Sequence, residues 1–177
     1  RGSNLKSTDK LYFFYAGHGI PAQMEQGDPY LLAHDMSAGF ASLDDDMKLS
    51  NIWNLLSASG QGEVVAFLDS CFSGNSDNRL IYEGVAPGLL KRKKFSQSGD
   101  ENLLVYTAGN EQQFANYYPE KGHRLFSYFL LKGLMEGIRQ PEQLHRYLTR
   151  NVQRVSQQNG PDYTQTPQMS GRASGDL

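Results

Sequence analysis

The chain has 177 residues, of which 38% are hydrophobic and 20% charged, a composition typical of one globular domain with a packed core. Its formal net charge of -2 provides no global positive field, and no apolar run approaches the roughly 18–20 residues of a membrane-spanning helix. We therefore expect neither nucleic acid nor a membrane as a partner. The single cysteine, Cys71, excludes an intrachain disulfide and favours a reducing, cytoplasmic location.

The first third of the chain predicts a strand, a short extended piece and a helix. Residues 11–16 are apolar throughout and rich in aromatic side chains, which is typical of a strand buried on both faces in a parallel sheet. Residues 30–33 indicate a short extension or hairpin piece. From Leu49 to Leu56 apolar side chains recur at helical spacing, and the acids at 44–46 favour a helix N-terminus just before them.

The remainder predicts two more strands and two more helices. Residues 64–68 and 103–108 repeat the buried-strand pattern, and residues 75–100 between them form a long loop without periodicity. Helices are expected over residues 123–136 and from Pro141 onward, because apolar positions recur on one side of each and proline suits a first helical turn.

This order of elements indicates an α/β fold with a mainly parallel sheet. We expect one domain over residues 1–177, with a core at about 11–158 and an extended C-terminal tail at 160–177. Three strands alone would leave the apolar first strand at an exposed edge of the sheet. We therefore predict that further N-terminal strands, from upstream in the same precursor, complete the fold.

Two of the predicted strands end in glycine-bearing turns, one holding His18 and the other Cys71. The crevice of an open parallel sheet lies beyond the carboxyl ends of its strands, which are about 4.8 Å apart. Adjacent strand ends would bring the imidazole and the thiol together, as nucleophilic thiol catalysis requires. The backbone N–H groups of Gly19 and Cys71 could then face a developing oxyanion. The alternative is that both side chains are structural, since a lone cysteine is often a small buried hydrophobe.

The motifs at these turns are Tyr-Ala-Gly-His-Gly at residues 15–19 and Leu-Asp-Ser-Cys-Phe-Ser-Gly at residues 68–74. Together they resemble the caspase-like cysteine peptidases, and most closely the metacaspase and bacterial caspase-homologue branch. The histidine precedes the cysteine by roughly 50 residues, which is the spacing found in caspases. Residues 106–109 and 122–130 also look like the bacterial homologues.

The resemblance implies a function and a set of roles. Cys71 would be the nucleophile, His18 the general acid and base, and the N–H groups of Gly19 and Cys71 the oxyanion hole. Peptide bonds would be hydrolysed through a thioester acyl-enzyme. The family fold also begins with two strands and helices before the histidine strand, and this chain lacks them, in agreement with the strands predicted to be missing.

Asp69 lies two residues before Cys71, so its side chain is expected on the same side of the strand end. Its carboxylate would suit the floor of an S1 pocket for Arg or Lys, and metacaspases, which this pattern resembles, prefer basic P1 residues. The alternative is that Asp69 caps the following turn or orients local backbone N–H groups.

The basic run Lys91–Lys94 then predicts an autoprocessing site, with a solvated basic loop as the alternative.

Acidic residues form one candidate metal set. Asp35, Asp45, Asp46 and Asp77 fall near the places at which many metacaspases bind an activating Ca²⁺, and carboxylate oxygens suit this ion. The alternative is that residues 44–46 cap a helix and that the other acids are surface residues. We expect no required cofactor and assign no other metal ligand.

Two functions from different classes remain open. The leading hypothesis is a cysteine endopeptidase that cleaves protein or peptide substrates after Arg or Lys. The second is a catalytically silent caspase-fold module that binds proteins, against which the presence of both His18 and Cys71 counts. Because peptidase domains of this kind are commonly fused to sensing or effector modules, the resemblance also implies such domains as partners.

Overall fold

The structure is a computed structural model with a four-stranded sheet at its centre. The residues it describes are 6, 8–20, 28–36, 44–58, 62–72, 102–110 and 113–177, together with the backbone at 75–76 and 79–80. No helix in this part of the chain is both long enough and apolar enough to cross a bilayer.

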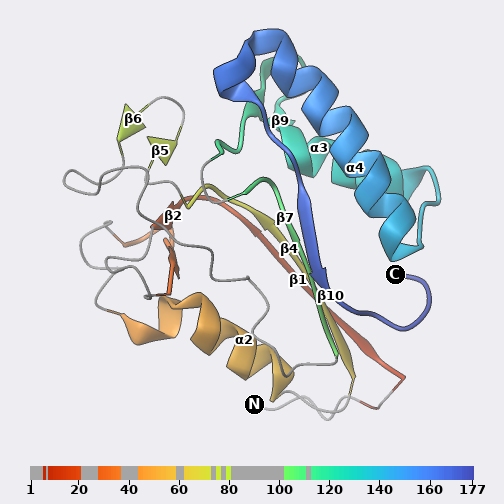
Figure 1. Ribbon diagram of the computed structural model, residues 1–177. Helices are drawn as coiled ribbons and strands as arrows, with labels where there is room; N and C mark the ends of the chain where they lie inside the picture. The colour runs from red at the N-terminus through yellow and green to blue at the C-terminus, as the bar shows by residue number, and fades with distance from the viewer. Residues whose placement is uncertain are drawn as a thin grey trace.

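The central sheet has the strand order β1-β4-β7-β10 (Figure 1). Strands β1 (Lys10–Ala16), β4 (Glu63–Asp69) and β7 (Leu103–Thr107) are parallel, which confirms the three strands predicted from their apolar runs. Strand β10 (Gln168–Gly171) pairs antiparallel with β7. The fold class is therefore α/β with a mostly parallel sheet, as predicted.

Helices cover both faces of this sheet (Figure 1). On one face lies α2 (Leu49–Ser57), preceded by a 3-10 turn (Asp45–Met47) in which the side chain of Asp44 accepts from the N–H of Asp46. On the other face lie α3 (Leu125–Met135) and α4 (Pro141–Ser156), and α4 begins with its proline in the first turn. Each of the three predicted helices is present.

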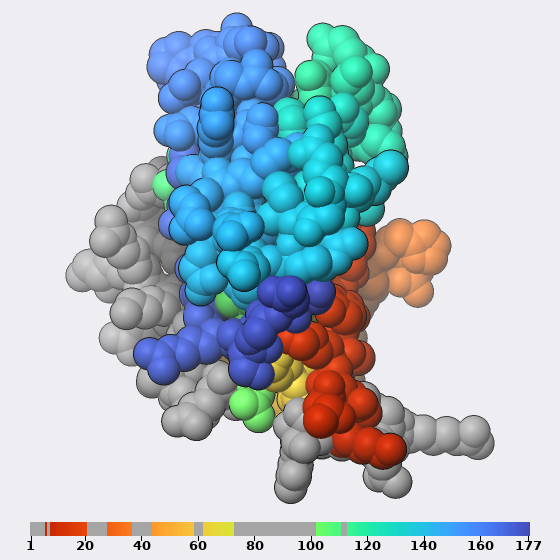
Figure 2. Space-filling view, turned by 90° about the vertical axis from the view of Figure 1, so that its right-hand side faces the viewer, coloured from red at the N-terminus to blue at the C-terminus, as the bar shows by residue number. Residues whose placement is uncertain are grey.

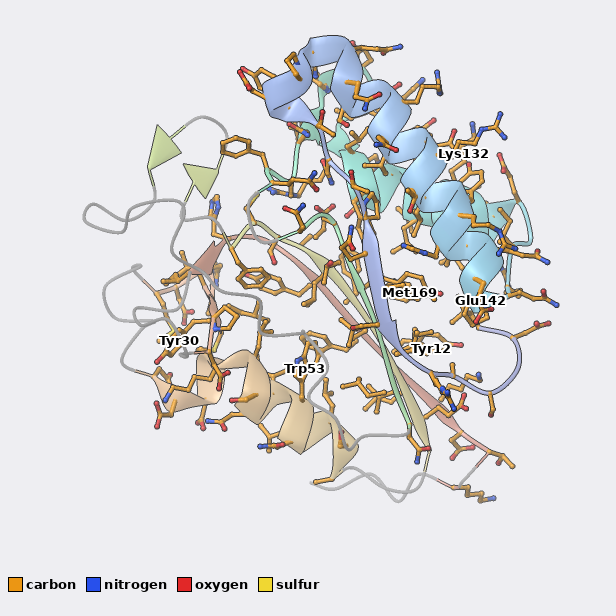
Figure 3. The ribbon with its side chains drawn as sticks, viewed as in Figure 1. Tyr12, Tyr30, Trp53, Lys132, Glu142 and Met169 are labelled. Carbon is orange, nitrogen blue, oxygen red and sulfur yellow. The ribbon has the colours of Figure 1, made fainter. Side chains whose placement is uncertain are left out.

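Successive side chains of β4 and β7 point in turn into two apolar clusters, one on each face of the sheet. Val65 and Phe67 of β4 pack with α3 and α4, whereas Val64, Ala66 and Leu68 pack on the side of α2. Figure 3 shows Trp53 of α2 reaching toward the sheet, where its ring meets that of Phe13 edge-on with 6.2 Å between centroids. Burial on both faces explains why these two strands are apolar without alternation.

Strand β1 differs from the prediction that residues 11–16 are buried on both faces. Tyr12 and Phe14 are 52% and 54% exposed, and their side chains alternate with inward-facing Leu11, Phe13 and Tyr15. Strand β1 lies at one edge of the sheet, where it pairs with β4, and the exposure of Tyr12 and Phe14 shows that this stretch of its face is not covered. Figure 2 shows the red atoms of this segment at the surface below α3 and α4.

The C-terminal segment 160–177 contains the 3-10 turn Pro161–Tyr163, and part of it belongs to the sheet. Gln168–Gly171 form the edge strand β10, and Met169 packs against the cluster that includes β7 and α4. Beyond it, the backbone N–H of Leu177 donates to the carbonyl of Arg139 at 2.7 Å. Beyond β10, Ala173 and Leu177 also pack against this core cluster, so the C-terminus is held against the domain.

Short elements surround the carboxyl end of the sheet. Residues 30–31 form a hairpin piece, as predicted, because β2 (Gly19–Ile20) pairs antiparallel with β3 (Tyr30–Leu31). The remaining pairs and 3-10 turns are β5 (Asn75–Ser76) with β6 (Arg79–Leu80), β8 (Tyr117–Tyr118) with β9 (His123–Arg124), Pro119–Lys121, Gln157–Asn159 and Pro161–Tyr163. The basic run Lys91–Lys94 lies outside the described residues.

Candidate active site

The two glycine-bearing turns lie side by side at the carboxyl end of the sheet. Ala16, the last residue of β1, is in register with Asp69, the last residue of β4. The pairing continues past both strand ends, since the N–H of Gly19 donates to the carbonyl of Cys71 at 3.1 Å. His18 and Cys71 each follow two residues after the paired strand ends. The structure thus brings the predicted histidine and cysteine turns together.

Gly19 is required at its place by close packing. A Cβ atom built there would lie 2.6 Å from the carbonyl oxygen of Cys71 and closer still to the ring of Phe72. Its N–H group is already used by the bond to that carbonyl. An oxyanion bound by Gly19 would therefore have to replace this backbone bond, and the oxyanion role of Gly19 and Cys71 stays a prediction.

Cys71 is covered in this structure. Only 2% of the residue is exposed, and the backbone N–H of Ala115 donates to its Sγ atom. Ala115 is itself buried and belongs to the segment between β7 and β8. A donor at sulfur stabilises a thiolate over a thiol, which is the form a nucleophilic cysteine needs.

Two donors hold the backbone carbonyl of His18. Its carbonyl accepts from the N–H of Leu32 at 3.0 Å and from the hydroxyl of Tyr15 at 2.7 Å. Burial raises the pKa of Tyr15, so the hydroxyl stays protonated as a donor. The Nδ1 atom of His18 is buried and has no hydrogen-bond partner in the described part of the chain. Buried polar atoms are rarely left so, which makes this ring nitrogen a candidate for contact with substrate.

Asp69 is fully buried and binds the start of helix α3. Its Oδ2 atom accepts from the N–H of Ser127 at 3.0 Å and from the Ser127 hydroxyl at 2.5 Å. Helix α3 has no capping side chain of its own, so Asp69 supplies an N-terminal acceptor from another strand. This contact differs from the alternative role predicted for Asp69, which was to cap the following turn or orient local backbone N–H groups, because the N–H belongs to Ser127, 58 residues further along the chain.

The other oxygen of the same carboxylate holds an arginine. Arg124 Nε donates to Asp69 Oδ1 at 3.3 Å, and its Nη2 donates to the carbonyl of Ala115 at 3.0 Å. The Arg124 side chain is 17% exposed, whereas that of Asp69 has no exposure. Burial raises the pKa of Asp69, and the charge of Arg124 and the bonds from Ser127 oppose this effect.

Several residues of this site were given no role from the sequence, although Arg124 and Ser127 lie within the stretch 122–130 that resembles the bacterial homologues. Ala115 acts through its backbone, and Arg124 and Ser127 lie more than 50 positions from Asp69 along the chain. Gln165 is a further case: it is fully buried, accepts from the N–H of Asn116 at 2.8 Å, and donates to the carbonyl of Ala108 at 2.9 Å. It thereby ties the segment beside Cys71 to the end of β7.

The described residues assemble no metal centre. In the described ranges no three His, Cys, Asp or Glu side chains approach closely enough to share an ion. Asp45 pairs with Lys48 at 2.5 Å, Asp35 lies exposed 3.8 Å from His34, and Asp46 has its N–H capped by Asp44. Asp77 lies outside the described residues, so the calcium set of Asp35, Asp45, Asp46 and Asp77 stays a prediction.

A histidine turn and a cysteine turn lie at neighbouring carboxyl ends of a mostly parallel, helix-covered sheet, the place at which open α/β domains carry their sites. The family model for the caspase domain (Peptidase_C14) matches residues 2–177, so the chain belongs to the caspase-domain family. This confirms the family-level resemblance found in the sequence.

One solved structure supports the same fold. The chain is similar to the crystal structure of protein GSU0716 from Geobacter sulfurreducens, with a TM-score of 0.57 and 18% sequence identity. The match covers 95% of this chain and 68% of that protein. At this identity the likeness concerns the fold alone. No curated protein is similar enough in sequence to be counted as a relative.

Proposed function

We propose that the chain is a cysteine endopeptidase of the metacaspase and bacterial caspase-homologue branch that cleaves after Arg or Lys. The observation that carries the proposal is a buried carboxylate, Asp69, which lies two residues before Cys71 and already binds a guanidinium group. Membership of the caspase-domain family supports peptide hydrolysis, and the adjacent His18 and Cys71 turns support its chemistry.

In the proposed reaction the Cys71 thiolate attacks the carbonyl carbon of the scissile bond. The bond to sulfur forms as the carbonyl electrons move to oxygen, where the N–H groups of Gly19 and Cys71 would stabilise the charge. His18 protonates the leaving amine when the tetrahedral intermediate collapses to a thioester. His18 then takes a proton from a water molecule as the water oxygen attacks the thioester carbonyl. The C–S bond breaks, the acyl group leaves as a carboxylic acid, and the Cys71 thiolate is restored beside protonated His18.

Asp69 would supply the selectivity of this reaction. The buried Asp69 carboxylate should discriminate strongly between P1 side chains by their charge. A positive side chain compensates the carboxylate for its lost hydration, whereas a negative side chain does not. A planar guanidinium can also donate to it in a defined geometry, as Arg124 does here. We therefore infer P1 Arg above P1 Lys, and both far above P1 Asp.

A second candidate is the catalytically silent interaction module. The observations that favour it are the 2% exposure of Cys71 and the engaged N–H of Gly19. On this alternative the closed arrangement is the working state, and no peptide reaches the thiol.

Hydrolysis of fluorogenic peptides with Arg, Lys or Asp at P1 separates the two candidates. The proposal expects turnover of the Arg and Lys peptides and a loss of at least about 10³-fold in Cys71→Ala. Asp69→Asn should lower kcat/KM for the Arg peptide relative to that for the Asp peptide by about 10²-fold. Runs with Ca²⁺ and with a chelator test the calcium prediction. Absence of turnover by folded protein in every run would favour the silent module.

A further inference from the structure

A continuous set of contacts links the acid of the proposed S1 site to the nucleophile. It begins at Asp69 Oδ1, which accepts from Arg124 Nε, and passes to the carbonyl of Ala115, which accepts from Arg124 Nη2. It ends at Cys71, because the N–H of the same Ala115 donates to Sγ. One guanidinium therefore bridges the carboxylate and the backbone segment that covers the sulfur.

Arg124 presents the same group that a P1 arginine would present. The Asp69 Oδ2 atom is taken by the N–H and hydroxyl of Ser127, and Arg124 Nε is the donor observed at Oδ1. A substrate guanidinium and Arg124 would therefore compete for the same oxygen. Arg124 is the partner that can leave, because its side chain is 17% exposed and a rotation into solvent would rehydrate its charge.

We propose that Arg124 is a built-in occupant of the S1 acid, which holds Ala115 over Cys71 until the basic side chain of a substrate replaces it. Two consequences follow. Without Arg124 the Ala115 segment loses one of its ties, and Cys71 becomes accessible to small reagents. A basic P1 residue would also open the site that it enters, because it takes over the carboxylate that Arg124 releases. The second consequence rests on the proposed function, whereas the first does not.

The first consequence is tested with iodoacetamide, which has no P1 side chain and alkylates a thiolate directly. Cys71 is the only cysteine, so the mass of the intact chain reports its alkylation alone. We expect Arg124→Gln to react at least about tenfold faster than the wild type, since removing the closing contact raises the fraction of open molecules. Arg150→Gln, on the exposed face of α4, removes the same charge elsewhere and should react at the wild-type rate.

Folding is checked in each variant by its thermal midpoint and near-ultraviolet circular dichroism. If Arg124→Gln does not fold, Arg124→Lys replaces it: a lysine keeps the charge but cannot bridge both acceptors, so an intermediate rate of about threefold above wild type is expected. An unchanged or lower alkylation rate in whichever of the two variants folds would overturn the proposal.

The second consequence is tested with peptide substrates. In Arg124→Gln the KM for a P1 Arg peptide should fall by about tenfold with little change in kcat, because a competitor for the same carboxylate has gone. If Arg124 were merely structural, its replacement would lower kcat for all peptides alike. That result would overturn the proposal that a basic P1 side chain displaces Arg124. If neither the wild type nor any variant cleaves a peptide, but Arg124→Gln still raises the alkylation rate of Cys71, the proposed function fails. The proposal that Arg124 holds Ala115 over Cys71 is then still supported.

Discussion

Asp69 shows how much one residue of this site carries. Its carboxylate has no exposure, yet it binds Arg124 on one oxygen and the start of helix α3 on the other. The sequence predicted that Asp69 points to the same side of the strand end as Cys71, and it left open a pocket role and a role in capping the following turn or orienting local backbone N–H groups. In the structure the carboxylate instead binds Ser127 of a distant helix while it also holds the guanidinium of Arg124.

A prediction at this scale concerns stability. Asp69→Ala should lower the free energy of unfolding by about 3 kcal/mol, because it leaves the part-buried charge of Arg124 without its partner and the N-terminus of α3 without its acceptor. Urea unfolding followed by circular dichroism measures the loss. Asp162→Ala, at an exposed position, serves as the control and should change stability by less than about 0.5 kcal/mol. A similar small change in both variants would contradict this view of Asp69.

At the scale of elements, neighbouring residues of strand β1 point in opposite directions, one toward the core and the next toward solvent. Phe13→Ala should cost about 3 kcal/mol, because its ring packs against Trp53 and the cluster under α2. Phe14→Ala should cost less than about 1 kcal/mol, because Phe14 is 54% exposed on the other side of the strand. Equilibrium unfolding in urea compares the two variants directly. Equal losses would mean that the outer face of β1 is covered in solution.

A second prediction at this scale concerns the contact between β7 and α4. The buried hydroxyl of Tyr106 donates to the carbonyl of Pro141 at 2.9 Å, so Tyr106→Phe should lower the free energy of unfolding by about 1 kcal/mol at pH 7. Burial, with a smaller effect from the charge of Glu142, raises the pKa of Tyr106 above its ordinary value of 10.

The sign of the pH dependence follows from this shift. The folded chain holds the Tyr106 proton more tightly than the unfolded chain, so the contribution of this group is complete below pH 10 and is lost as the pH rises further. The wild type should therefore lose its advantage over Tyr106→Phe between about pH 10 and 11, in urea titrations at several pH values. Tyr117→Phe, half-exposed on β8, is the control. A difference that stays constant across this range would refute the prediction.

For the whole molecule, the local part of the fold could be predicted and the distant part could not. The strands β4 and β7, the three helices and the adjacency of the His18 and Cys71 turns follow from apolar periodicity and from the geometry of parallel sheets. The cover over Cys71 could not be predicted, because Ala115 acts through its backbone and Gln165 comes from beyond α4. Such contacts depend on how distant segments meet, and no residue pattern records them.

The strand order also explains where prediction of burial failed. An apolar run predicts a strand, but only the sheet order decides whether that strand has neighbours on both sides. Strand β4 lies between β1 and β7 and is buried from its second residue to its last, whereas β1 is at the edge. The structure of GSU0716 extends beyond the part matched here, since the match covers 68% of that protein. This likeness does not test the further N-terminal strands that the sequence predicts.

We infer that Cys71 is a nucleophile whose selectivity comes from Asp69. The most direct test is covalent labelling by a pair of peptidyl acyloxymethyl ketones that differ only in carrying Arg or Asp at P1, with the modified residue located by mass spectrometry. Our account predicts that the Arg label modifies Cys71 at least about 10²-fold faster than the Asp label, and that Asp69→Asn removes the difference. Equal rates for the two labels in the wild type, or no modification of Cys71 by either, would contradict it.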